Sequence, residues 1–113
     1  MIAVSTFRPS DQCSDEYREN QIRAVDSWGV FDGVIYLGDH DEELASANTR
    51  FITWEPFPRL RDAIVFCAAH PGWASIINAD IVVGSNLRAV ETMLSNRGAL
   101  CASSWRWEFE NGD

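Results

Sequence analysis

The chain has 113 residues, 46% of them hydrophobic, and this length and composition predict a single globular domain over residues 1–113. Its formal net charge is −8, and all nine basic residues are arginines. This acidic balance argues against a nucleic-acid-binding protein and against non-specific binding to anionic membranes. No apolar run reaches the length that a membrane span needs. A small anionic ligand is still compatible with the charge, because a few well-placed arginines can neutralise it.

The cysteines and the N-terminus bear on the compartment. Cys13, Cys67 and Cys101 are widely separated and odd in number, and they show neither metal-ligand spacing nor a disulfide framework. Residues 1–6 carry no basic segment before their apolar residues, so they predict a first strand and not a signal peptide. We therefore expect a reducing compartment, the cytoplasm.

The first half of the chain alternates strand and helix patterns. Residues 2–7 predict a strand, and Ser14 is a suitable N-cap for a helix that runs to about Trp28. Residues 33–38 predict the second strand, and residues 50–55 a short third strand rich in aromatic and β-branched residues.

The second half continues the alternation. A helix over about residues 59–70 is apolar nearly all round, so we expect it to be well buried. Ser85 or Asn86 caps a third helix. Residues 99–103 predict a fifth strand, and residues 105–110 alternate apolar with charged side chains, as a half-exposed strand does.

The most apolar run, residues 73–83, is interrupted by Asn78 and Asp80. Such a run predicts a strand buried on both faces of a parallel sheet, where an unpaired carboxylate is costly. Asp80 is therefore either a metal or ligand carboxylate at the end of the strand, or a structural acid that caps the next helix or pairs with a buried arginine.

This alternation predicts an α/β domain with a mainly parallel sheet. If the strand order is 3-2-1-4, the chain reverses direction between the first strand and the strand around Ile76, and ligands bind in the crevice at such a reversal. Thr6 and Arg8 leave the first strand there, and Asn78 and Asp80 leave the fourth.

Several short segments resemble the nucleotide-diphospho-sugar transferases with the GT-A fold. The stretch Ile77-Asn78-Ala79-Asp80-Ile81 is similar to the acidic metal-binding motif of that family. The other segments follow in the family's order and cover nearly the whole chain: residues 5–9, 21–28, 35–39, 58–62 and 104–108. The resemblance implies a single Rossmann-like domain with a mainly parallel, three-layer α/β/α sheet.

The resemblance also implies a function, namely binding of a nucleotide-diphosphate sugar and glycosyl transfer to an acceptor. Mn²⁺ or Mg²⁺ would bridge the diphosphate at Asp80 and Asn78, although many members have Asp where Asn78 stands. Asp39 would hold the base or ribose, and Arg8 would reach phosphate. No catalytic residue is assigned, and the similar enzymes usually continue into a second half that binds the acceptor.

Other interpretations stay open for each of these residues. Arg8 is equally typical of a solvated loop, and Asp39 of a turn after a glycine. Arg59 and Arg61 oppose the helix dipole, which hints at an anionic partner, yet exposed arginines are common. Asp62 is either a ligand contact or a favourable acid in the first turn.

A non-catalytic binding or interaction module is the alternative to a transferase. If the chain is a complete protein, Trp105, Trp107 and Phe109 would form an exposed apolar strip, and we expect a homodimer through that edge.

Overall fold

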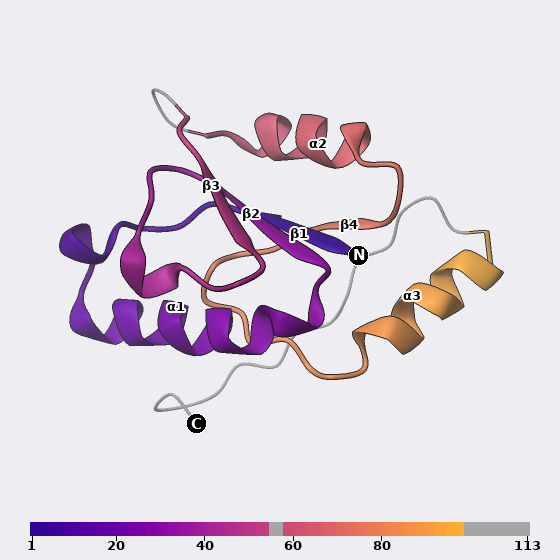
Figure 1. The fold of residues 1–113 in the computed structure, drawn as a ribbon, viewed down its shortest axis with the longest axis horizontal. Helices are drawn as coiled ribbons and strands as arrows, with labels where there is room; N and C mark the ends of the chain where they lie inside the picture. Colours follow the sequence, from indigo (N-terminus) through magenta and orange to yellow (C-terminus); the bar gives the residue numbers. More distant parts are fainter. Residues whose placement is uncertain (55–57, 99–113) are drawn as a thin grey trace.

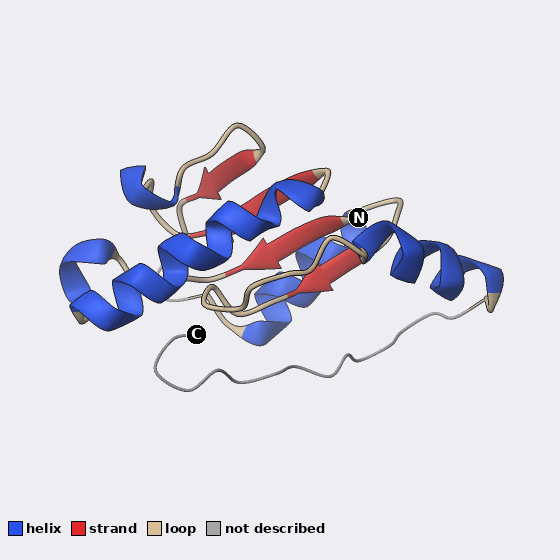
Figure 2. Cartoon of the chain, turned by 90° about the horizontal axis from the view of Figure 1, so that it is seen from below, coloured by secondary structure: helices blue, strands red, loops and turns tan. Residues whose placement is uncertain are grey.

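The structure is a computed structural model, and it describes residues 1–54 and 58–98. Within these residues a four-stranded, all-parallel sheet has the order β3-β2-β1-β4 (Figure 2). The α/β class and the parallel sheet are therefore confirmed, and the order is the 3-2-1-4 that the reversal between β1 and β4 requires. The strands are β1 (Ile2–Ser5), β2 (Gly33–Leu37), β3 (Thr49–Ile52) and β4 (Ala74–Ile76).

The register places β1 in the middle of the sheet. Ile2 pairs with Gly33 of β2 on one side and with Ala74 of β4 on the other. The chain runs outward from β1 to β2 and β3, and then crosses back to β4 on the other side of β1. The carboxyl ends of β1 and β4 therefore flank the reversal of strand order.

Three helices connect or follow the strands: α1 (Asp15–Ser27), α2 (Leu60–Ala69) and α3 (Leu87–Asn96). The Ser14 hydroxyl accepts a hydrogen bond from the Tyr17 backbone N–H at 3.2 Å, so the predicted N-cap of α1 is confirmed. Figure 1 shows α1 and α2 on opposite faces of the sheet. The third helix, α3, lies beyond the amino ends of the strands (Figure 2), where the Met1 amino group donates to Glu91 Oε2 at 3.2 Å. Gly98 follows α3 with φ 65°, a left-handed conformation that suits glycine at a helix end.

Apolar side chains pack on both faces of the sheet. The successive residues Ala3 and Val4 are both fully buried, and because they point to opposite faces, β1 is covered on both sides. The larger cluster lies against α1 and centres on Trp28 and Tyr36, whose rings stack with centroids 5.7 Å apart. The smaller cluster lies against α2 and includes Val4, Leu37 and Ala63.

The prediction of one long buried strand over residues 73–83 is wrong. Only Ala74–Ile76 form β4, and Ile76 and Val82 are 44% and 48% exposed. The chain leaves the sheet after β4 and is held against α1, because Trp28 Nε1–H donates to the Ile81 carbonyl at 2.7 Å. The central positions go to β1 and β2, so β4 is an outer strand of the described sheet.

The prediction that α2 is well buried is also wrong. Leu60, Ile64 and Val65 are 66%, 50% and 64% exposed, whereas Ala63 is buried against the sheet. A helix packed on a sheet buries only one side, and no described residue covers the outer side of α2. Apolar side chains on the outer side of this helix are therefore exposed and not covered by any described residue.

The strands expected at residues 99–103 and 105–110 lie outside the described residues, as do Cys101 and the expected dimer edge. Among the helices that the structure describes, none is sufficiently long and apolar to span a bilayer.

Candidate functional site

A hollow of about 190 Å³ lies where the carboxyl ends of β1 and β4 meet the start of α2. Three segments far apart in sequence contribute to it, which is the arrangement expected at the reversal of strand order. Its polar lining consists of Ser5, Thr6, Arg59 and Asn78, and its apolar lining of Pro58, Leu60, Ala63, Ile76 and Ile77. Three residues predicted to act at the site, Thr6, Arg59 and Asn78, are thus brought together.

Ser5 is a site residue that the sequence reasoning missed. Its side chain is buried, and its hydroxyl lies within hydrogen-bonding distance of the carbonyl oxygens of Thr6, at 3.0 Å, and Ile77. The second of these contacts ties the end of β1 to the chain leaving β4. The available signal was a hydroxyl residue that ends a buried apolar strand at the reversal.

Arg59 is the basic residue of this hollow. Its side chain is exposed, and it forms no ion pair with any residue that the structure describes. Its backbone N–H donates to Asp62 Oδ2 at 2.7 Å, and the same oxygen accepts from Trp54 Nε1–H at 3.1 Å. Asp62 therefore holds the start of α2 in place and does not line the hollow.

Arg8 contacts Tyr17, in the first turn of α1, and not the hollow. The Arg8 guanidinium carbon lies 4.7 Å from the centroid of the Tyr17 ring, within cation–π range. Burial raises the pKa of Tyr17, and the negative charge of Asp80 raises it further, while the Arg8 cation lowers it. Neither Arg8 nor Asp80 is among the residues that line the hollow.

Asp80 itself is exposed, in the turn after β4. An exposed carboxylate stays solvated, so Asp80 does not need a partner to offset a cost of burial. The structural alternative is not borne out among the described residues either, because α3 begins at Leu87 with Asn86 as its N-cap and Asp80 forms no ion pair there.

Asp39 follows β2 and is also exposed. The acid that organises this loop is instead Asp41, which accepts hydrogen bonds from the Ser10 backbone N–H at 3.0 Å and from the Glu43 backbone N–H at 3.1 Å. Asp39 and Thr6 leave neighbouring strands at the same edge of the sheet, but Asp39 does not line the hollow. Arg61, in the first turn of α2, does not line it either.

Asn78 and Asp80 do not fit a divalent metal centre on their own. Asn78 lines the hollow, whereas Asp80 does not. Mn²⁺ and Mg²⁺ need several oxygen ligands converging on one point. Among residues 1–54 and 58–98, no group of three or more His, Cys, Asp or Glu side chains could hold a metal ion.

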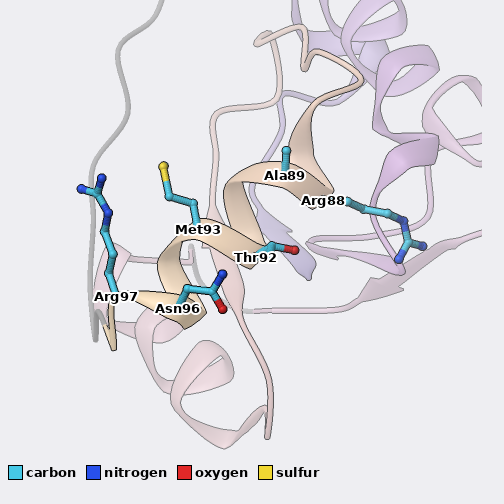
Figure 3. A pocket seen from close by; sticks show the side chains of 6 residues that line it. All are labelled: Arg88, Ala89, Thr92, Met93, Asn96 and Arg97. Carbon is cyan, nitrogen blue, oxygen red and sulfur yellow. The ribbon is translucent and has the colours of Figure 1, made fainter.

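A larger hollow, of about 590 Å³, lies on α3 and is open to solvent (Figure 3). Within residues 1–54 and 58–98, its lining comes from this helix and its C-cap: Arg88, Ala89, Thr92, Met93, Asn96 and Arg97. In Figure 3 the side chains of Arg88 and Arg97 point away from each other. The Arg88 Nη2 atom lies 3.7 Å from Asp32 Oδ1. Side chains that diverge from one helix cannot surround a ligand, so the smaller hollow is the better candidate site.

The candidate site is therefore the hollow between β1, β4 and α2. It combines one unpaired arginine with hydroxyl and amide groups, a set that binds phosphate or sugar oxygens. Comparison of the chain with protein-family models, with curated proteins and with solved structures finds no match.

Proposed function

We propose that the domain binds a nucleotide-diphosphate sugar, with the ligand's diphosphate or sugar in the hollow at the carboxyl ends of β1 and β4. The observation that carries this proposal is the convergence of Thr6, Arg59 and Asn78 on one space at the reversal of strand order. Parallel α/β sheets bind ligands at this position, outside the carboxyl ends of their strands.

We also propose that the domain has a three-layer, Rossmann-like fold. An all-parallel sheet with α1 and α2 on opposite faces supports a three-layer, Rossmann-like domain of the GT-A type (Figure 1). In such a domain the nucleotide would extend from the hollow along the carboxyl edge toward Asp39, which follows the neighbouring strand β2. Asp39 would then hold the ribose or base.

Glycosyl transfer is the reaction that this ligand would serve. The leaving diphosphate gains negative charge as the bond between the sugar and its phosphate oxygen breaks and the sugar passes to the acceptor. Cationic or hydrogen-bonding groups that face the diphosphate lower the barrier to this step. Arg59 is the residue in the hollow with the charge for this role. A divalent cation at Asp80, which the sequence resemblance implies, stays a separate prediction.

The alternative is a non-catalytic binding or interaction module. The observation that favours it is the uncovered apolar side of α2, where Leu60, Ile64 and Val65 are each at least half exposed. Exposed apolar patches on soluble domains often mark interfaces. Light scattering over a range of protein concentrations tests the expected homodimer, and a monomer throughout would contradict it.

Titration calorimetry with uridine, guanosine, adenosine and cytidine diphosphates tests the binding proposal, with each titration run in EDTA and in Mn²⁺. We expect saturable heat with one or two of the four nucleotides. If none of the eight titrations gives heat, the domain does not bind this class of ligand and the interaction module becomes the better assignment.

A further inference from the structure

The charges at the hollow do not match those of a metal-bridged diphosphate site. Among the described residues, the lining contains one formally charged side chain, the Arg59 cation, and no carboxylate. A divalent cation placed there would face a positive charge, with no acid of the described lining to hold it. Asp80, the acid expected to hold the cation, is exposed and does not line the hollow.

Arg59 is free to bind an anion from outside the chain. The acid nearest to it along α2 is Asp62, whose Oδ2 accepts from the Arg59 backbone N–H and from Trp54 Nε1–H. The guanidinium takes part in no ion pair with a described residue. In a chain of net charge −8, an unpaired cation that lines a hollow favours an anionic ligand there.

The size of the hollow limits which part of the ligand it takes. Pockets that enclose a whole drug-sized ligand measure roughly 300–1,000 Å³. At about 190 Å³, this one is smaller, so it holds only a portion of a nucleotide sugar. The portion that suits an arginine flanked by hydroxyl and amide donors is the diphosphate, since the guanidinium binds phosphate oxygens in pairs.

We infer that the hollow binds the diphosphate directly, through the side chains of Arg59, Thr6 and Asn78, and that no divalent cation bridges it. This inference rests on the proposed function and specifies how the same site takes its ligand. It assigns Asn78 to the phosphate as an amide donor, and it leaves Asp80 outside the binding site.

Calorimetry with the nucleoside diphosphate that binds best tests this inference, using the wild-type chain and four variants in EDTA and in Mn²⁺. We expect the wild type to bind in EDTA, and Mn²⁺ to change its Kd by less than about twofold. Arg59→Ala should weaken binding by about 10- to 100-fold, the usual effect of losing a hydrogen-bonded charge. Arg59→Lys should lose less, because it keeps the charge but not the paired donors.

Arg61→Ala is the matched control, since Arg61 is an exposed arginine two residues away that does not line the hollow. Its Kd and that of Asp80→Asn should stay within about twofold of the wild type. Thermal melts of each variant check folding, and the Arg59 side chain can be truncated without touching the backbone bond to Asp62.

The outcomes separate the two levels of the proposal. Binding that requires Mn²⁺ and is lost in Asp80→Asn overturns the inference and leaves the proposed function standing. Binding in EDTA that is indifferent to Arg59→Ala also overturns it, because the anion would then lie elsewhere. An absence of binding under all conditions removes the inference and the proposed function together.

Discussion

The side-chain amide of Gln21 both accepts a hydrogen bond from the main chain of Arg8 and donates one to it. Gln21 Oε1 accepts from the Arg8 backbone N–H at 2.9 Å, and Gln21 Nε2–H donates to the Arg8 carbonyl at 2.9 Å. Gln21 is fully buried in α1, so this pair fixes the chain that leaves β1 to the first helix. This glutamine therefore anchors the loop next to the candidate site to α1, and Asp41 holds the same loop at Ser10.

Gln21→Leu should lower the free energy of unfolding by roughly 1–3 kcal/mol, because both polar groups of the Arg8 main chain lose their partner. Urea denaturation at 25 °C measures the change. Arg8→Ala is the control. It keeps the main-chain hydrogen bonds and removes only the exposed contact with Tyr17, worth about 0.5–1 kcal/mol. Equal losses in the two variants would show that the side chain of Arg8, not its backbone, secures the loop.

Tyr36→Phe should leave stability unchanged or raise it by about 1 kcal/mol. The Tyr36 hydroxyl is buried and has no hydrogen-bond partner among the described residues, so it carries a desolvation cost without compensation. The ring keeps its stacking with Trp28 and Phe51 in the variant. A loss above about 1 kcal/mol in urea denaturation would mean that the hydroxyl does have a partner.

The same residue gives a pH dependence. Burial raises the pKa of Tyr36 far above its ordinary value of 10.0, since the phenolate is disfavoured in the core. The pKa of Tyr36 is higher in the folded protein than in the unfolded chain, so the neutral phenol contributes fully to stability below pH 10. This contribution is lost as the pH rises above that value. Urea titrations from pH 8 to 11 should therefore show a steeper loss of stability in the wild type than in Tyr36→Phe. Parallel profiles would contradict this assignment.

Gly38→Ala should destabilise the protein by about 1–3 kcal/mol, the usual cost of overpacking. A Cβ at this position would lie 2.8 Å from Cε1 of Phe7, and the Phe7 ring is itself packed edge-on against Tyr36 and Phe51. Gly29→Ala is the matched control, because a Cβ there meets nothing within 4 Å. Thermal and urea unfolding of both variants should separate them; similar stabilities would show that Phe7 moves aside freely.

Asp62→Ala should cost about 1–2 kcal/mol, as expected when a carboxylate at a helix start loses its backbone partner. It removes the acceptor shared by the Arg59 backbone N–H and Trp54 Nε1–H. Asp62→Asn keeps an oxygen acceptor and should lose less. If Asp62→Ala abolishes nucleotide binding without loss of stability, Asp62 contacts the ligand directly, as first expected from the sequence.

The sequence by itself predicted the α/β class, a mainly parallel sheet and the N-cap at Ser14. These features follow from local patterns, namely hydrophobic period and capping chemistry. The strand order with β1 in the centre was only a condition for the expected crevice, and the tertiary structure decided it. The sequence also singled out Thr6 and Arg59 as nucleotide-binding candidates and Asn78 as a metal ligand, and all three line one hollow.

Only the tertiary structure decided which apolar segments are covered. The most apolar run, residues 73–83, forms the outer strand β4 and the turn after it. The place of each strand in the sheet depends on pairing between segments that are distant in the sequence. For the same reason the sequence could not decide whether Asp80 is buried or exposed, or whether Asp62 contacts a ligand or stabilises the start of α2. Burial of a side chain depends on what packs against it from elsewhere in the chain, and one sequence specifies that only through the complete fold.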